Sequence, residues 1–515
     1  MKTFGVYLLA ALVRQALALP ASEIRTPTPT ADHARAGAVR AAYKTAWAGY
    51  YKYAWPHDEL LPISNTYVDD RAQWGLTPID GLDTAIVMND KDIVNTILDF
   101  IPTVDFTTTR KVGETISLFE TTIRYIGGLL SAYDLLKGPY KRLANDPKKV
   151  DALLTQAASL ADTLSIAFDT PSGIADGYLV LNPSRKISGA ASSNLAEVGT
   201  LILEWTRLSD LTGNPKYAQL AAKCEAHLLA PKGSPEAWPG LVGTDISTTN
   251  GTFLNSAGGW SGGADSFYEY LIKMYVYDPK SYGQYRDRWV AAADSTMEHL
   301  ASNPTSRKDL TFLKQFNGQN TEPVTGHLTS FAGGNFILAG TVLKEDKYTQ
   351  FGLALAESYF ATYTATASGI GPETFRWVDT AANTSTQQPP ADQASFYAKA
   401  GFWVDGGAYI LRPETMESLY YAYRATGDKK YQDLAWSGFS AIAKRCRVGS
   451  GFSGLRDVRR EDGGGFDDLQ QSFFLAETLK YAYLIFADDT PVQVKGDGAN
   501  QFVFNTEAHP FKVRG

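Results

Sequence analysis

A turn that recurs along the 515 residues constrains the fold more than any other feature of this sequence. Its clearest copies span Leu211–Tyr217 and Ala425–Tyr431, and each joins two segments in which apolar residues recur at helical spacing. In both copies a glycine stands where a helix ends, since that position favours a left-handed backbone, and Asn or Asp follows as a cap. Looser copies occur at Tyr277–Pro279 and Lys344–Tyr348. The turn therefore predicts helical hairpins that repeat through the chain.

Alternating strand-like segments are few, so the sequence predicts one large all-α domain built from these hairpins. Two arrangements remain open at this point. An open solenoid would present an extended binding surface, whereas a closed barrel would direct inward-facing residues at one central pocket. Apolar periodicity is the same in both arrangements and does not choose between them.

The charge balance and the missing motifs exclude several classes of function. The net charge is −7 and no strong basic block occurs, which argues against nucleic acid and anionic membranes as partners. The six histidines are scattered rather than clustered as zinc ligands would be. No nucleophile-elbow, phosphate-loop or dinucleotide-binding motif is present. Cys224 and Cys446 are too few for a disulfide scaffold, and a pair or two buried free thiols are both open.

The first residues have the pattern of a secretory signal. Met1 and Lys2 precede an apolar segment, Phe4–Val13, and small residues follow. The alternative is a membrane anchor, which needs roughly 20 apolar residues, about twice the length of this segment. Arg14 also ends the apolar segment. We therefore predict a signal peptide over residues 1–20, a flexible leader over 21–37 and a single domain over 38–515.

A signal peptide implies the secretory pathway, and we expect a secreted, monomeric protein without a membrane anchor. Asn250 and Asn383 each begin an Asn-x-Ser/Thr sequon and are the predicted glycosylation sites in that compartment.

Two predicted helices carry charged pairs four residues apart, a spacing that places both side chains on one face. Glu120 and Arg124 form the first pair, and Gly127-Gly128 follow in the same apolar helix. Because each glycine destabilises a helix interior by roughly 1 kcal/mol, the two glycines indicate close backbone packing. The second pair, Asp265 and Glu269, is doubly acidic, so its repulsion must be offset by a cation, sugar hydroxyls or ordered water.

The segment Leu411–Ser418 contains the most informative acid. Pro413 suits the start of a helix, which places Glu414 in the first turn. There the helix dipole favours an anion, as a general base requires. Glu417 and Arg412 extend the cluster.

Further acids interrupt apolar helices, and such acids are rarely buried without a partner. They are Glu197 and Glu477, and the Pro-Glu-Thr element recurs at Glu373. Several helices that each carry one acid imply a shared acidic pocket. Glycoside hydrolysis needs two carboxyl groups of unlike protonation, and a crowd of acids both raises some pKa values and can hold a hard cation.

Taken together, the motifs resemble those of the class I α-mannosidases, glycoside hydrolase family 47. In chain order they are Ala54–Leu60, Phe119–Tyr133, Ala264–Tyr270, His327-Leu328, Gly371–Glu373, Leu411–Ser418, Ser472–Thr478 and Phe504–Pro510. The resemblance implies an (α/α)7 barrel of helical hairpins that is plugged near its C-terminal end. It also implies inverting, Ca2+-dependent hydrolysis of terminal α-1,2-linked mannose on high-mannose N-glycans or glycoproteins.

The resemblance also implies roles for single residues. The catalytic carboxylates are Glu120, Asp265, Glu373 and Glu414. Glu120 is the first choice for the general acid, Asp265 the second, and Glu414 is the base. Thr506 would bind Ca2+ directly through its carbonyl and hydroxyl oxygens, and waters on the metal would be held by Glu417, Glu477 and Glu507. The expected substrate-binding residues are Arg124, Glu197, Glu269, His327, Arg412, Phe473 and Glu477.

Three departures from the family pattern affect these expectations, and the first is Gln471, which stands where an acid is often seen before Ser472. Ser330 stands where the family commonly has the first cysteine of a disulfide, so that crosslink is expected to be missing. Gly263 stands where the family members of the endoplasmic reticulum carry arginine. In having glycine here, the chain resembles the Golgi and secreted fungal members. This glycine predicts broad trimming, from Man9 toward Man5.

Two other readings compete with this one. A lectin-like quality-control protein would share the fold and the cation site but hydrolyse little. Another (α/α)-barrel glycosidase would act on glucans, but the Thr506-Glu507 motif argues against it. The full set of matched carboxylates favours the mannosidase.

Overall fold

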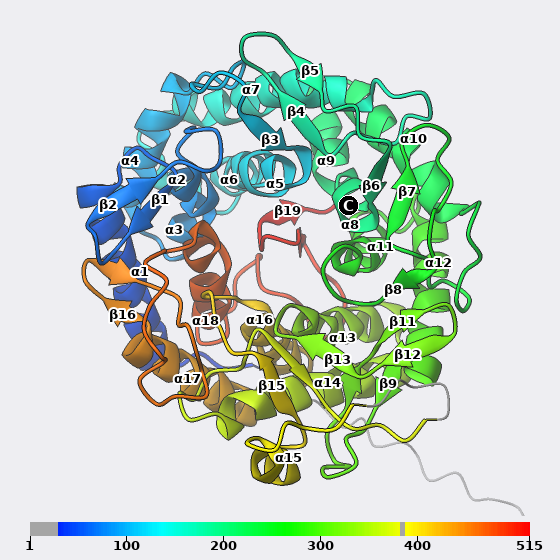
Figure 1. Cartoon of the computed structure of the whole chain (residues 1–515). Helices are drawn as coiled ribbons and strands as arrows, with labels where there is room; N and C mark the ends of the chain where they lie inside the picture. Colours follow the sequence, from blue (N-terminus) through cyan, green and yellow to red (C-terminus); the bar gives the residue numbers. More distant parts are fainter. Residues whose placement is uncertain (1–28, 382–386, 515) are drawn as a thin grey trace, which may run out of the picture.

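The structure is a computed structural model that describes residues 29–381 and 387–514. Its helices form two concentric rings around a central axis (Figure 1). In the described chain seven helix pairs pack against one another: α3 with α4, α6 with α7, α9 with α10, α11 with α12, α13 with α14, α16 with α17, and α18 with α1. The inner helices also contact in sequence and close the ring, since α18 packs against α3. The architecture is therefore a closed barrel of seven hairpins, as predicted, rather than an open solenoid.

The helices of the barrel have these bounds: α1 His33–Tyr53, α2 Leu76–Asp80, α3 Leu82–Val87, α4 Lys91–Phe100, α5 Leu118–Glu120, α6 Gly127–Lys137, α7 Pro147–Leu164, α8 Leu195–Gly199, α9 Ile202–Thr212, α10 Lys216–Leu229, α11 Asp265–Tyr277, α12 Gly283–Ser295, α13 Phe331–Leu343, α14 Asp346–Ala365, α15 Ala394–Ala400, α16 Glu414–Thr426, α17 Lys429–Arg445 and α18 Leu479–Leu484. The π-helical segments are η2 Thr121–Ile126, η5 Thr296–Leu300 and η7 Phe474–Thr478. Short 3-10 turns are η1 Ile101–Thr103, η3 Lys141–Leu143, η4 Ser165–Phe168 and η6 Leu328–Ser330.

The recurrent turn has the predicted conformation at its two clearest copies. Gly213 and Gly427 end α9 and α16 with φ of 72° and 67°, in the left-handed region. Asp428 then caps α17 by accepting a hydrogen bond from the backbone of Lys430. The looser copy at Tyr277 differs, because that tyrosine ends α11 and the next helix begins only at Gly283.

The first helix begins before the expected start of the folded domain at Ala38. Asp32 caps it by accepting a hydrogen bond of 3.0 Å from the backbone of Arg35, so α1 begins at His33, inside the expected leader. The predicted signal peptide and the Asn383 sequon lie outside the described residues. Within those residues, none of the helices combines the length and apolar character needed to cross a membrane.

In the part of the chain that the structure describes, eight small antiparallel sheets join the helices. Their strands are β1 Glu59–Leu61 with β2 Thr66–Val68; β3 Thr115–Ser117, β4 Tyr178–Val180 and β5 Lys186–Ile187; β6 Ser192–Asn194 with β7 Asp245–Ser247; β8 Ala257–Gly258, β11 Gln315–Asn317 and β12 Asn320–Glu322; β9 Ala301–Ser302 with β10 Phe312–Leu313; β13 Val324–Gly326, β14 Thr374–Arg376 and β15 Trp403–Gly406; β16 Arg447–Val448 with β17 Gly451–Phe452; and β18 Phe502–Phe504 with β19 Pro510–Lys512. The last pair is a hairpin that lies inside the ring (Figure 1).

Two glycines of the inner ring allow close packing, Gly127 against that hairpin and Gly128 against α2. A Cβ atom at Gly127 would lie 2.8 Å from Asn505 Nδ2, and one at Gly128 would lie 2.6 Å from the carbonyl oxygen of Ile79. The close backbone packing predicted from the glycine pair is therefore present. Asn505 completes the fit, because its side chain donates to the carbonyl oxygen of Ile123 (3.0 Å) and accepts from the backbone of His509 (2.8 Å).

The hydrophobic core lies between the two rings. Trp289 of outer α12 packs its ring against Phe336 of inner α13 and Tyr348 of α14. Cys224 and Cys446 are both buried and unpaired, which settles the open question of their pairing. Ser330 stands where the family commonly has a cysteine. It donates a hydrogen bond to the carbonyl oxygen of His327, and its hydroxyl lies 2.9 Å from Thr415 Oγ1.

Candidate active site

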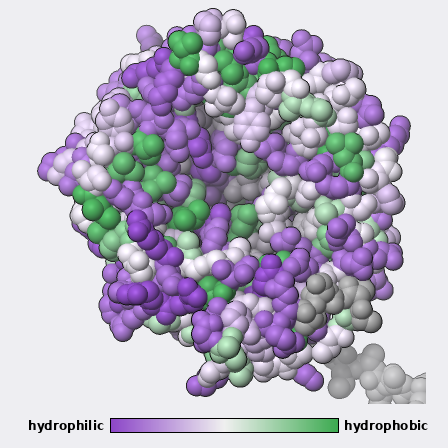
Figure 2. All heavy atoms as spheres, in the orientation of Figure 1, coloured by the Kyte–Doolittle hydropathy of each residue, from purple (hydrophilic) through white to green (hydrophobic). Residues whose placement is uncertain are grey.

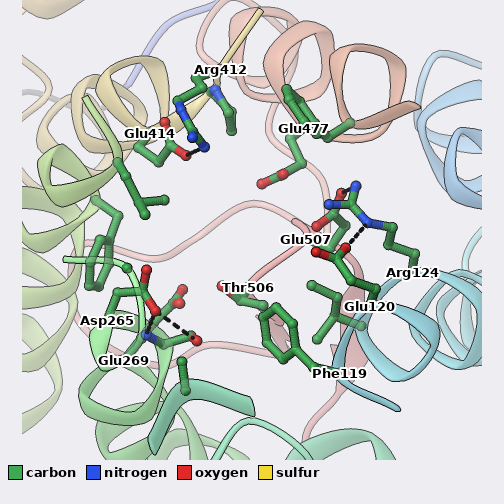
Figure 3. A pocket seen from close by; sticks show the side chains of 18 of the residues that line it. Phe119, Glu120, Arg124, Asp265, Glu269, Arg412, Glu414, Glu477, Thr506 and Glu507 are labelled. Atoms are coloured by element: carbon green, nitrogen blue, oxygen red, sulfur yellow. Dashed lines mark hydrogen bonds and ion pairs between the residues drawn. The ribbon is translucent and has the colours of Figure 1, made fainter. Parts of the chain in front are cut away.

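A cavity of about 320 Å³ opens inside the ring, with the turn of the β18–β19 hairpin as its floor. Figure 2 shows the hollow in the middle of one face, and Figure 3 shows its side chains. The lining residues are Phe119, Glu120, Ile123, Arg124, Asn194, Ala196, Glu197, Gly262, Gly263, Asp265, Ser266, Glu269, Leu328, Phe331, Arg412, Pro413, Glu414, Glu417, Phe473, Glu477, Thr506 and Glu507. We call it the central cavity.

Acids dominate the lining of the central cavity. It carries eight carboxyl groups, Glu120, Glu197, Asp265, Glu269, Glu414, Glu417, Glu477 and Glu507, against the two guanidinium groups of Arg124 and Arg412. Such an imbalance inside a protein raises pKa values by repulsion unless a cation offsets it. The lining also contains Phe119 and Phe473, whose rings provide apolar surface beside the acids.

Glu120 enters the cavity from the junction of α5 and η2, as an ionised partner of Arg124. Arg124 Nε donates to Glu120 Oε2 at 2.7 Å, and the guanidinium lies 5.5 Å over the ring of Phe473. Burial raises the pKa of Glu120, but Arg124 and Arg71 outweigh it and leave that pKa below its ordinary value. This direction is opposite to the one a general acid needs at neutral pH.

Asp265 has the contrasting electrostatics. It begins α11 two residues after Gly263, whose φ of 92° gives the approach loop a left-handed turn. Burial, reinforced by the nearby Glu269 and Glu414, raises the pKa of Asp265 to about 6. Glu269 itself pairs with Lys273 one turn along the helix, so a lysine, together with the other groups of the cavity, offsets the predicted repulsion between the two acids.

Glu414 is the first residue of α16, as the proline before it predicts. His327 Nδ1 lies 2.8 Å from Glu414 Oε2, and Arg412 Nη1 lies 3.5 Å from Glu414 Oε1. Burial raises the pKa of Glu414, but the hydrogen bond to His327 and the charge of Arg412 lower it more, so the carboxylate stays ionised. An ionised, fixed carboxylate is what a general base requires.

Three acids around the floor of the cavity have raised pKa values, in contrast to Glu414. Burial raises the pKa of Glu417 and of Glu507 to about 8, and mutual repulsion with other acids adds to it. Burial and the charge of Glu507 raise the pKa of Glu477 well above its ordinary value. Figure 3 shows Glu477, Glu507 and Thr506 directed at the same part of the cavity.

A buried ion-pair layer supports this floor from behind. It consists of Asp80, Asp83, Lys480 and His509, all without solvent exposure. His509 Nδ1 lies 2.8 Å from Asp83 Oδ2, and Lys480 Nζ lies 2.6 Å from Asp83 Oδ1. Lys480 also donates to the carbonyl oxygen of Ala508 at 2.6 Å. The layer therefore fixes the turn that carries Thr506.

Comparison with known proteins decides the family of this chain. The sequence profile of glycosyl hydrolase family 47 matches residues 42–513. The chain belongs to this family. This match confirms the family that the sequence motifs predicted.

Several relatives of this family 47 chain are fungal proteins. The mannosyl-oligosaccharide alpha-1,2-mannosidase 1B of Aspergillus phoenicis is 53% identical over 480 residues, which is 93% of this chain and 91% of the relative. The mannosyl-oligosaccharide alpha-1,2-mannosidase of Penicillium citrinum is 49% identical and shares 94% of this chain and 93% of its own. The structure of the alpha-1,2-mannosidase from Trichoderma reesei superposes with a TM-score of 0.93 at 60% identity, covering 94% of this chain and 100% of that one.

Most of the predicted family 47 site residues meet in the central cavity. Two do not line it. Glu373 binds Arg412 through both carboxylate oxygens, at 2.8 and 2.9 Å from Nε, and so holds that arginine in place. His327 is buried between Glu414 and Tyr363, whose hydroxyl lies 2.6 Å from Nε2. Both residues orient groups of the cavity from behind.

Several contributors escaped the sequence prediction. Lys273 stands four residues after Glu269, a helical spacing that could have identified it. The ion-pair layer brings Asp80 and Asp83 against His509 across more than 400 positions, and no local pattern indicates such a pairing. The π-helical geometry of η2 and η7, which carry Arg124 and Glu477, also has no clear sequence signal.

The lining of the cavity offers oxygen donors to a cation. Among the described residues there is no group of three or more His, Cys, Asp or Glu side chains placed to hold a metal. Thr506 lines the cavity and is held there by its backbone N–H, which donates to Tyr270 Oη (3.2 Å), and it carries a carbonyl and a hydroxyl oxygen. Hard cations prefer such oxygens, and the surrounding acids can hold the waters of the cation.

Asn250, the sequon within the described residues, is exposed. Its side-chain oxygen accepts from the backbone and hydroxyl of Thr252, at 3.0 and 2.7 Å, within a turn. Glycosylation there stays a prediction, as does the Asn383 site.

Proposed function

We propose that this protein is an α-1,2-mannosidase that removes terminal mannose from high-mannose N-glycans with inversion and with the help of Ca2+. The single observation that carries the proposal is the central cavity, where an ionised Glu414 and a protonatable Asp265 face the same enclosed space. The names of the fungal relatives supply the linkage and the sugar. The fit of a glycan into a cavity inside a closed ring favours terminal residues over internal ones.

The base in this proposal is Glu414. It would take a proton from the attacking water, because His327 and Arg412 keep it ionised and fixed. In an inverting enzyme the second carboxyl group protonates the leaving oxygen. We assign that proton to Asp265, the second choice from the sequence, since its pKa of about 6 allows protonation near neutral pH.

Glu120, the first choice from the sequence, acts in this proposal as an ionised carboxylate. Its ion pair with Arg124 keeps its pKa low, and in Figure 3 it lies across the cavity from Asp265 and Glu414. From there it would stabilise the positive charge that develops on the sugar ring.

α-Mannosyl fluoride separates the two assignments, because fluoride leaves without protonation. We expect Asp265→Asn to recover most of its activity on this substrate, and Glu120→Gln to stay impaired. Recovery of Glu120→Gln alone would return the general acid to Glu120.

Calcium is the proposed cofactor. Thr506 would bind it through its carbonyl and hydroxyl oxygens, and Glu417, Glu477 and Glu507 would hold its waters. When bound, the ion supplies positive charge and sugar-hydroxyl ligation at the floor of the cavity. The acids themselves support the proposal, because burial and then mutual repulsion raise their pKa values, and a divalent cation beside Thr506 would relieve the repulsion.

The trimming range follows from Gly263. The φ of 92° is strained for any residue with a side chain, so the loop beside Asp265 stays without a bulky group. An open loop at this point favours access for several branches, from Man9 toward Man5. We place the reaction in the secretory pathway, with secretion of a monomer as the expected end point.

The second candidate is a lectin-like protein that binds the glycan without cleaving it. One incubation separates the two. The protein is mixed with Man9GlcNAc2 with and without EDTA, and the released sugar and its first anomer are followed by NMR.

We expect release of β-mannose that EDTA abolishes and Ca2+ restores, with continued trimming toward Man5. Tight binding without release would favour the lectin. Arrest after one mannose would reject the broad trimming range, and release of α-mannose would reject inversion.

A further inference from the structure

A second cavity of about 270 Å³ lies beside the central one. Asp70, Arg71, Ala72, Thr115, Ile116, Ser117, Phe119, Glu120, Thr121, Tyr178 and Glu197 line it. It lies between the β3–β4 strands, the segment before α2 and the start of α5, at the rim of the ring in Figure 1. We call it the side cavity.

The two cavities share a wall. Phe119, Glu120 and Glu197 line both of them. Tyr178 of β4 donates from Oη to Glu197 Oε1 at 3.2 Å, across from Ser117 in the strand pairing. A sugar chain that leaves the central cavity over this wall therefore enters the side cavity next.

The chemistry of the side cavity suits a neutral sugar. Tyr178 is 43% exposed, and an exposed aromatic ring beside polar groups can pack against the apolar face of a hexose. Asp70 and Arg71 form an ion pair at 3.2 Å, which offers an acceptor and donors to neighbouring hydroxyl groups. Thr115, Ser117 and Thr121 add hydroxyl groups to the lining.

Arg71 carries an independent sign of a missing partner. Its Nε is buried and has no hydrogen-bond partner among the described residues, although buried donors are almost always paired. Arg71 lines the side cavity together with Glu120 of the shared wall. The volume of the side cavity is slightly below the roughly 300 Å³ at which pockets for drug-sized ligands begin. We therefore expect it to hold one sugar unit rather than several.

We propose that the side cavity is a sugar subsite, in which Tyr178 and Arg71 bind the third mannose unit counted from the non-reducing end of the substrate. The first unit fills the central cavity, the second crosses the shared wall as the leaving group, and the third lies on Tyr178. This inference rests on the proposed mannosidase function. In this role the side cavity would favour longer substrates when they bind, before the mannosyl bond is cleaved.

Two substrates that differ by one sugar test the subsite, namely α-1,2-linked mannotriose and mannobiose. For the unaltered protein we expect kcat/KM on the triose to exceed that on the biose about tenfold, mainly through KM. Tyr178→Ala and Arg71→Ala should each bring this ratio close to one. Tyr178→Phe, which keeps the ring, should preserve most of the preference.

The matched control is Tyr51→Ala. Tyr51 is 50% exposed on α1 and lines neither cavity, so the ratio should stay at its original value. A ratio near one in the unaltered protein, or an unchanged ratio in both Tyr178→Ala and Arg71→Ala, would overturn the subsite. Equal losses on the two substrates would also overturn it. If the unaltered protein cleaves neither substrate, the proposed function itself fails, which is a different result.

Discussion

We call the acids Glu414, Glu417, Glu477 and Glu507 of the central cavity its acidic wall. This wall and the ion-pair layer behind it are both buried but differ in charge balance. In the layer, Asp83 lies against Lys480 and His509, and these cations outweigh burial and lower its pKa. On the wall, Glu477 lies among other acids, and burial with repulsion raises its pKa. Burial alone therefore does not decide ionisation, because the nearest opposite charges do. The matched layer supports the structure, and the unmatched wall leaves room for a cation and a substrate.

The largest expected effect is on catalysis by the wall. Glu414→Gln keeps the shape of the side chain but removes the general base, so we expect kcat to fall by about 10²–10⁴-fold. Assays of mannose release from Man9GlcNAc2 measure the loss. Glu298→Gln is the control, since Glu298 is an exposed glutamate on η5. Activity within a fewfold of the original would remove Glu414 from its role.

The next effect is on stability and concerns the layer. Lys480→Met leaves Asp83 buried with one cation fewer, and breaking a buried pair in this way lowers the free energy of unfolding by about 3–5 kcal/mol. Lys347→Met is the control, because Lys347 pairs with Asp294 at the exposed surface, where a pair contributes less than about 1 kcal/mol. Urea unfolding compares the two variants. Equal losses would mean that the layer is not a stabilising element.

These two variants also mark how far the sequence could predict the site. Glu414 follows a proline at the start of a helix, a local signal that gave both its place and its ionised state. Lys480 and Asp83 are nearly 400 positions apart and meet only because the barrel closes. Local spacing likewise predicted the Glu120–Arg124 contact and the turn at Gly427, whereas the placement of His327 behind Glu414 depends on packing between hairpins.

The wall predicts an effect of the opposite sign in the absence of metal. A pKa of Glu477 that is raised in the folded state gives stability that is present below its unfolded pKa and is lost as the pH rises. Glu477→Gln removes this penalty, so in EDTA at pH 7 we expect the variant to be more stable by about 1–3 kcal/mol. Thermal unfolding from pH 5 to 8 measures the slope. A variant that is less stable than the original at pH 7 would contradict the charge deficit of the wall.

The smallest effect concerns an acid that belongs to neither region. Glu225 of α10 is buried, both of its carboxylate oxygens lack partners among the described residues, and burial alone raises its pKa well above the ordinary value. As for Glu477, the raised pKa means that the contribution of Glu225 to stability is lost as the pH rises. Glu225→Gln should therefore add about 1 kcal/mol at pH 7 and flatten the pH dependence.

Glu204→Gln is the matched control for Glu225. Its carboxylate accepts hydrogen bonds from Tyr270 (2.6 Å) and Asn505 (2.8 Å), so the amide should destabilise the fold instead. A gain in both variants, or in neither, would show that hydrogen bonding does not distinguish these two buried acids.

Titration of Ca2+ into the EDTA-treated protein by calorimetry tests the central claim most directly, because the claim is that the unmatched wall is completed by a cation. We predict saturable binding of one Ca2+ per chain, weakened in Thr506→Ala and Glu477→Gln, together with recovery of mannose release. Lack of saturable binding by a folded protein that still cleaves Man9GlcNAc2 in EDTA would contradict it.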